Sequence, residues 1–188
     1  LFSANGSGLS QWDIANGTRI SMPELAIDDS VYAIDVSPDG RLVLAGVNGA
    51  AVLLDSTSGR ELARVTAEAL VTSVAFLPDG RRAIVGGEAV MLVDLNHASV
   101  TRRYADASHG VELIGSGGSF ATFSGEDGTV RIVDVESGRA VRSIARPNRG
   151  ADSLSVSPTG DRLVAAGPVA ELWETTNGER IRSFRNSA

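Results

Sequence analysis

Apolar and polar positions follow a pattern that returns about every forty residues along the chain. Within each copy, two short apolar runs enclose a turn, a third apolar run ends in an acidic residue, and a fourth run alternates arginine or glutamate with apolar residues. The runs come at roughly ten-residue intervals, are rich in β-branched residues, and show no helical period. The pattern therefore predicts an all-β chain with four strands in each copy.

The acidic residue that closes the third run sets the register of the copies. Its successive spacings are 42, 39, 40 and 40 residues, and it falls at Asp13, Asp55, Asp94, Asp134 and Glu174. A proline turn, in which Pro presets φ and Gly accepts a left-handed conformation, separates the first two runs in three copies. Its markers are Pro38 and Gly40, Pro78 and Gly80, and Pro158 and Gly160, while Gly118 stands at the skipped position. The predicted units are a partial repeat over 1–30 and repeats over 31–70, 71–110, 111–150 and 151–188.

Polarity differs among the four strands of a copy. The first three are nearly continuously apolar, as in strands covered on both faces, whereas the charged fourth is typical of an edge strand that resists aggregation. A unit this small cannot bury its own faces and must stack on copies of itself. Four-stranded antiparallel sheets stacked around an axis form a β-propeller.

We therefore expect four complete blades and one incomplete blade, because the first copy lacks its innermost strand. Such an open arc leaves apolar flanks exposed. We therefore expect the chain to be part of a larger propeller, which missing sequence or another chain completes.

Three segments resemble the WD-repeat propeller family: GEDGTVRIVD (125–134), QWDIANG (11–17) and, as a near version, LWETTNG (172–178). The resemblance covers essentially the whole chain. It implies a propeller that presents a rigid, loop-lined surface to other proteins.

Several family features are incomplete in these repeats. The tryptophan before the acid is present only as Trp12 and Trp173, and the family's turn aspartate only as Asp127. The Gly-His pair before the first strand is missing, although His109 lies near that place in the fourth copy. The polar network of His, Ser or Thr, Asp and Trp that braces many such blades therefore cannot be complete in any copy.

Composition narrows the functional classes. The chain has no cysteine, so disulfides and thiolate zinc sites are excluded, and its two histidines, His97 and His109, have no partners at metal-ligand spacing. The net charge of −6 argues against nucleic acid, and no apolar run is long enough to span a membrane. All seventeen basic residues are arginine, which favours a GC-rich, bacterial source. The sequence fits a cytoplasmic and a periplasmic location equally well. We expect the protein to bind neither a metal nor a cofactor.

The repeated acids admit two interpretations. A ring of carboxylates around a channel would hold calcium, as in propeller hydrolases, whereas turn chemistry needs an Asp that bonds the backbone two residues on. Acids that recur in every copy favour turn chemistry. A catalytic site would instead use an acid that is found in one copy only. The acids of this kind are Asp28, Asp29, Asp35 and Asp152.

We expect a non-catalytic scaffold that mediates protein–protein interaction or complex assembly. The connections between blades and the turns between second and third strands should share one face. The candidate partner-binding residues on that face are Asp29, Ser30, Asn48, Glu88, His109, Glu126, Asn148 and Arg149. Two alternatives remain: an accessory propeller domain of a larger bacterial redox or hydrolytic enzyme, and a propeller enzyme with its own metal or channel site.

Overall fold

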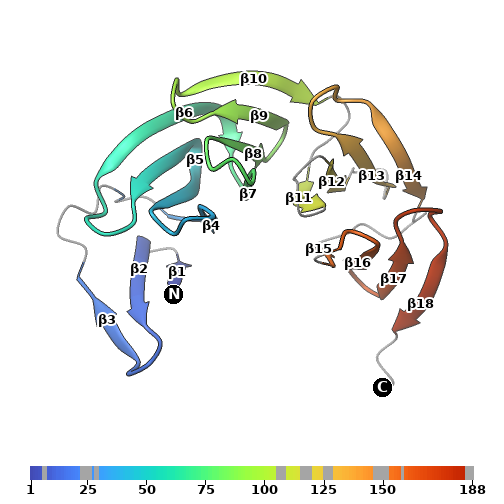
Figure 1. Cartoon of the computed structure of the whole chain (residues 1–188), viewed down its shortest axis with the longest axis horizontal. Helices are drawn as coiled ribbons and strands as arrows, with labels where there is room; N and C mark the ends of the chain where they lie inside the picture. The colour runs from blue at the N-terminus through green and yellow to red at the C-terminus, as the bar shows by residue number, and fades with distance from the viewer. Residues whose placement is uncertain are drawn as a thin grey trace.

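The protein is described here by a computed structural model, and all the regular structure in the described residues is β. The described residues are 1–5, 8–21, 27, 30–104, 109–114, 120–124, 129–145, 153–157 and 159–184. Within this part of the chain, eighteen strands form five antiparallel sheets that fan out as the blades of an open arc (Figure 1). The opening lies between the first sheet and the last. The predicted all-β propeller with four complete blades and one incomplete blade is therefore confirmed.

Each blade is a meander in which every strand pairs with the next strand in sequence. Blades 1 and 2 contain β1 (Phe2–Asn5), β2 (Gly8–Asp13) and β3 (Thr18–Ile20), then β4 (Ala33–Val36), β5 (Leu42–Asp55) and β6 (Glu61–Leu70). Blade 3 contains β7 (Ser73–Phe76), β8 (Arg82–Gly86), β9 (Val90–Asp94) and β10 (Ser99–Tyr104). Blades 4 and 5 contain β11 (His109–Ile114), β12 (Phe120–Ser124), β13 (Thr129–Asp134) and β14 (Ala140–Ala145), then β15 (Ser153–Val156), β16 (Arg162–Ala166), β17 (Ala170–Glu174) and β18 (Arg180–Phe184).

Blade 2 differs from its neighbours because β5 supplies two of its four strand segments. The backbone reverses near Gly49, whose φ is 74°. The N–H of Ser56 then donates to the Arg41 carbonyl at 2.9 Å, so the two ends of β5 lie side by side. Residues Val43–Gly46 pair with β4, and residues from Asn48 onward pair with β6. The expected second and third strands are therefore both present, joined without a break.

The hydrophobic core is divided among the contacts between blades. Among the described residues it forms four buried clusters, and each draws side chains from two successive blades or their connection. The inner strands β4, β7, β11 and β15 also lie beside one another in turn, which defines the hub. Each blade therefore depends on its neighbours for burial, as expected of a stacked repeat.

The contact between blades 3 and 4 shows how such a cluster is built. The rings of Tyr104 and Phe123 lie 5.1 Å apart, and Phe123 is 1% exposed. The Tyr104 hydroxyl donates to the Val135 carbonyl at 2.9 Å. Burial raises the pKa of Tyr104 to about 12, which keeps the hydroxyl protonated as a donor. An outer strand of one blade is thereby fixed to the third-strand end of the next.

The residue four positions after each strand-ending acid has a left-handed backbone. Its φ is 70°, 82°, 71° and 76° at Gly17, Gly59, Gly138 and Gly178. Blade 3 has Ala98 there instead, and its φ of 49° is the only positive φ of a non-glycine residue in the described chain. The repeated turn geometry therefore prevails over the preference of alanine for negative φ.

The strand-ending aspartates cap these turns. Asp55 accepts the Ser58 N–H at 2.7 Å, and Asp134 accepts the equivalent Ser137 N–H at 2.7 Å. Asp94 accepts the Asn96 N–H at 2.8 Å. The hydrogen bonds from Ser58 and Ser137 hold the pKa of Asp55 and Asp134 below the ordinary value of 3.8. These contacts agree with the turn-chemistry interpretation of the repeated acids.

Acid should weaken this repeated capping. The folded-state pKa values of Asp55, Asp94 and Asp134 are lowered, so their stabilisation is present above the unfolded-state value and is lost as the pH falls through the folded-state value. We expect the midpoint of urea unfolding to fall steadily below about pH 4. Asp134→Asn, which keeps an acceptor but cannot titrate, should flatten the dependence. An equally steep pH profile in this variant would contradict a role for Asp134.

Candidate functional site

The structure brings together two of the residues predicted to bind a partner, Asn48 and Glu88. Asn48 lies at the bend of β5 and pairs with Leu70, the last residue of β6. Gly87, beside Glu88, lies so close to this strand that a Cβ built on it would be 2.2 Å from the Leu70 carbonyl oxygen. The second-to-third strand turns of blades 2 and 3 therefore meet at Leu70, on one face.

The other predicted partner-binding residues are less informative. Ser30 is half-buried ahead of blade 2, and His109 lies in β11 opposite Ser124 rather than in a loop, because its backbone pairs with β12. The remaining four candidates, Asp29, Glu126, Asn148 and Arg149, lie outside the described residues. The repeat markers Asp127 and Pro158 lie outside them as well. Residues 68–70, which precede the connection from blade 2 to blade 3, are still strand, because Leu70 pairs with Asn48.

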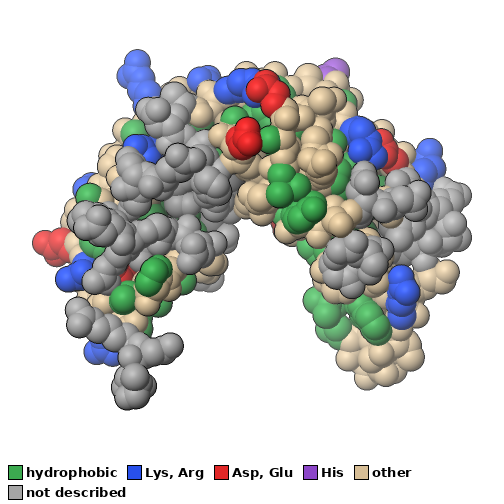
Figure 2. All heavy atoms as spheres, turned by 180° about the vertical axis from the view of Figure 1, so that it is seen from behind, with side chains coloured by type: hydrophobic (Ala, Val, Ile, Leu, Met, Phe, Trp, Pro, Cys, Tyr) green, Lys and Arg blue, Asp and Glu red, His purple; other side chains and the backbone are tan. Residues whose placement is uncertain are grey.

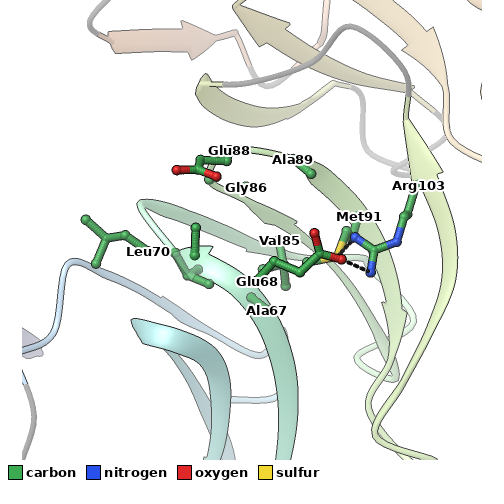
Figure 3. Close-up of a pocket in the computed structure, with 12 residues that line it drawn as sticks. Ala67, Glu68, Leu70, Val85, Gly86, Glu88, Ala89, Met91 and Arg103 are labelled. Carbon is green, nitrogen blue, oxygen red and sulfur yellow. Dashed lines mark hydrogen bonds and ion pairs between the residues drawn. The ribbon is translucent and has the colours of Figure 1, made fainter.

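A notch of about 160 Å³ opens between blades 2 and 3 at this place (Figure 3). One side comes from the end of β6 and the residue after it, Ala67–Val71. The opposite side comes from Val85–Ala89 at the end of β8, with Met91 of β9 and Arg103 of β10. The interior is apolar, and the charged side chains lie at its rim.

Three charged side chains line the rim of the notch. Arg103 Nη2 lies 3.2 Å from Glu68 Oε1, which joins the outer strands of the two blades, and Arg103 Nη1 donates to Met91 Sδ at 3.3 Å. Glu88 is exposed and has no partner among the described residues. Arg103 therefore neutralises the carboxylate of Glu68, whereas the carboxylate of Glu88 gives the rim of the notch a net negative charge.

Two glycines allow the strands to approach closely enough to form the notch. A Cβ on Gly46 would lie 2.7 Å from both Val71 Cγ1 and the Val71 carbonyl oxygen. Together with the contact at Gly87, this leaves no room for a side chain beneath Leu70 and Val71. Such distances are shorter than real Cβ contacts, so the close approach requires glycine at both positions.

The notch is suited to binding, and no catalytic set lies in it. Among the described residues, no group of three or more His, Cys, Asp or Glu side chains could hold a metal ion. Asp35, one of the acids found in a single copy, lies elsewhere and bridges two inner strands: its Oδ2 accepts the Phe76 N–H at 2.7 Å. Of the other acids of this kind, Asp28, Asp29 and Asp152 lie outside the described residues. No helix in the described chain meets the length and hydropathy of a membrane span.

Sequence reasoning missed the residues that give the notch its walls and its rim charge. Arg103 follows the charge pattern of an outer strand, which indicates edge protection, and yet its guanidinium binds Glu68 of the neighbouring blade. Met91 belongs to a continuously apolar strand, and this pattern predicts only that its side chains are buried in the core. One signal was available: the Gly86-Gly87 pair marks a close backbone approach.

Comparison with known proteins agrees with the fold. The chain is 29% identical over 174 residues to "Protein groucho" of Drosophila melanogaster, a WD-repeat protein, covering 84% of this chain and 24% of that protein. The crystal structure of the Myceliophteria thermophila Cps50 (Swd1) β-propeller domain superposes with a TM-score of 0.85 at 15% identity. That match covers 98% of this chain and 68% of the other. No family model matches the sequence.

The fold and these matches define a β-propeller of antiparallel blades. The resemblance to WD-repeat β-propellers is confirmed. The chain spans about a quarter of the length of the curated relative that it matches.

Proposed function

We propose that the protein is a non-catalytic scaffold whose notch between blades 2 and 3 binds an extended segment of a partner protein. The segment would insert one apolar side chain between Leu70, Val85 and Met91, with a basic residue next to it in sequence. Likeness to WD-repeat propellers supports an interaction scaffold in general terms. The observation that carries the finer proposal is the apolar notch with the free carboxylate of Glu88 at its rim.

The size and charge of the notch define the ligand chemistry. A volume of about 160 Å³ accommodates a single aliphatic side chain and is well below the several hundred Å³ of a typical small-molecule site. Glu88 offers an acceptor for lysine or arginine, while Glu68 is already held by Arg103. Arg103 in turn disfavours a second cation close to β10. The basic residue of the partner should therefore lie on the Glu88 side.

A short peptide panel tests this proposal. We expect peptides with one Leu or Met next to Lys or Arg to shift the amide resonances of Leu70, Gly87 and Ala89, and peptides with Glu in place of the cation to bind more weakly. Glu88→Lys should lower the affinity for the basic peptides about 3- to 10-fold, the size of one rim charge pair reversed. Glu179→Lys makes the same charge change in blade 5 and should leave the affinity unchanged. Equal losses in both variants, or shifts confined to other blades, would contradict the notch as the site.

A further inference from the structure

A second cavity lies between blades 4 and 5, and we call it the blade 4–5 pocket. Its volume is about 300 Å³, nearly twice that of the notch. It opens beside the turns that follow the strand-ending acids, so it lies at the opposite end of the strands from the notch. Phe120, Ile132 and Val141 of blade 4 form an apolar wall, and Thr159, Thr175 and Thr176 of blade 5 form a wall that carries hydroxyl groups.

The preceding junction, between blades 3 and 4, shows why this pocket is open. Arg82 and Phe120 hold the same register, because each pairs with the acid that ends the following strand. Arg82 Nη1 lies 2.6 Å from Glu136 Oε1, so an ion pair spans the junction of blades 3 and 4. At the junction of blades 4 and 5, the residues in these two positions are Phe120 and Thr176, which cannot form an ion pair. The pocket therefore lies where a side-chain bridge closes the preceding junction.

An apolar side chain of the pocket wall is exposed to solvent. Val141 is the extra residue of a β-bulge in β14, and it is 56% exposed. Thr101 has the same place in the bulge of β10, and its hydroxyl donates to the Leu92 carbonyl at 3.1 Å. Valine has no such hydrogen bond to make, so its side chain is left as apolar surface for a ligand. Hydrophobic and arginine side chains both show at the surface of the limb of the arc that contains blade 5 (Figure 2).

A fixed positive charge also borders the pocket. Arg142 Nη1 donates to the Asn177 carbonyl at 2.9 Å, and Arg142 Nη2 donates to the Thr176 carbonyl. Both acceptors are uncharged, and no carboxylate of the described chain forms an ion pair with Arg142. The described lining includes no acid, although Asp161 accepts a hydrogen bond from the Thr159 hydroxyl beside it. The charge of Arg142 is therefore held in place without being neutralised.

We propose that the blade 4–5 pocket binds a small organic acid, that is, a carboxylate on a compact apolar body, independently of the notch. The apolar body lies against Phe120 and Val141, and the carboxylate faces Arg142. A guanidinium has five N–H donors, and the two carbonyls leave Arg142 with others for a charge-assisted hydrogen bond. A volume of about 300 Å³ is at the lower end of the range for small-molecule sites.

The pocket suits a free acid better than an extended peptide. A peptide that binds beside an outer strand pairs its main chain with a regular strand edge. The bulge at Val141 interrupts the edge of β14 at the pocket, and the ladder is disrupted there. The ligand must therefore be held by its own carboxylate and apolar body, without pairing of a main chain.

Three related probes test the proposal by NMR on the full chain. Phenylacetate should shift the amide resonances of Arg142, Thr175 and Thr176. Phenylacetamide has the same shape without the charge and should bind roughly 3- to 10-fold more weakly, because it cannot form the charge-assisted hydrogen bond. Acetate keeps the charge but has no apolar body, and it should bind at least about 10-fold more weakly.

A pair of charge variants locates the site. Val141→Glu places a carboxylate on the pocket wall and should weaken phenylacetate binding roughly 3- to 10-fold, while binding of phenylacetamide stays the same. Ile181→Glu is the matched control, because Ile181 is the extra residue of the bulge in β18, is 46% exposed and does not line the pocket. It should leave the binding of both probes unchanged.

A double variant closes the pocket. Phe120→Arg together with Thr176→Glu rebuilds the ion pair that joins Arg82 to Glu136 at the preceding junction. We expect this variant to lose the resonance shifts caused by phenylacetate and to keep the urea midpoint of the unchanged chain. Where the double variant does not fold, the comparison of Val141→Glu with Ile181→Glu still decides.

Three results would overturn the proposal. Equal binding of phenylacetate and phenylacetamide would show that Arg142 recognises no charge. Equal losses in Val141→Glu and Ile181→Glu, or shifts confined to other blades, would place the site elsewhere. Tighter binding of a capped peptide that ends in a phenylalanine carboxylate would assign the pocket to the end of a partner chain instead of a free acid. Each result leaves the notch unaffected, because the notch lies between blades 2 and 3.

Discussion

Replacing Phe123 by alanine is expected to lower the free energy of unfolding by about 3–5 kcal/mol, the range for a large aromatic side chain removed from a core. Phe123 is 1% exposed and packs on Tyr104 of the preceding blade, so the change leaves a cavity between two blades rather than within one. Urea unfolding followed by circular dichroism and tryptophan fluorescence measures the loss.

Phe184→Ala is the matched control for this variant. Phe184 has the same side chain on the open flank of blade 5 and is 47% exposed. Its removal should cost less than about 1 kcal/mol, as for surface substitutions in general. Comparable losses in the two variants would mean that burial between blades is not the main source of stability.

Replacing Gly87 by alanine should both destabilise the protein and distort the notch. The added methyl group would lie 2.2 Å from the Leu70 carbonyl oxygen, and backbone must move to relieve the contact. We expect a loss of about 1–3 kcal/mol, as for an overpacked core, together with weaker binding of the peptides described above. Urea unfolding and the Leu70 and Glu88 amide resonances report the two effects.

Gly49→Ala separates the steric effect from a general intolerance of side chains near this face. Gly49 has a φ of 74°, and the nearest atom to its Cβ position is 3.9 Å away, so the variant carries backbone strain without a clash. A cost of roughly 1 kcal/mol is expected from the left-handed conformation alone. If Gly87→Ala costs no more than Gly49→Ala, the close approach of Leu70 to blade 3 is contradicted.

The repeating part of the fold was predictable because its causes are local and recur in every copy. The acids that set the register, from Asp13 to Glu174, each end a strand, and the turn after each needs the same left-handed residue. Alternation of apolar runs with turns therefore sufficed to place the blades. Even Ala98 follows the rule of its position rather than its own preference.

The notch was only partly predictable because its residues do not repeat. The face was predicted from the shared position of the turns at Asn48 and Glu88. The partners Glu68 and Arg103 lie on different blades, and nothing in one copy of the repeat indicates the residue that it meets in the next. The continuous path of β5 through its bend likewise depends on pairing with β6, which the turn residues alone do not reveal.

Because each blade buries its faces only against immediate neighbours, disorder should spread inward from the two ends of the arc. In a nearest-neighbour stack the terminal units have half the interfaces of the inner units, and they fray first. Blades 2, 3 and 4 each have a neighbour on either side and should keep their order longest. The notch between blades 2 and 3 would then stay assembled after blade 1 or blade 5 has melted.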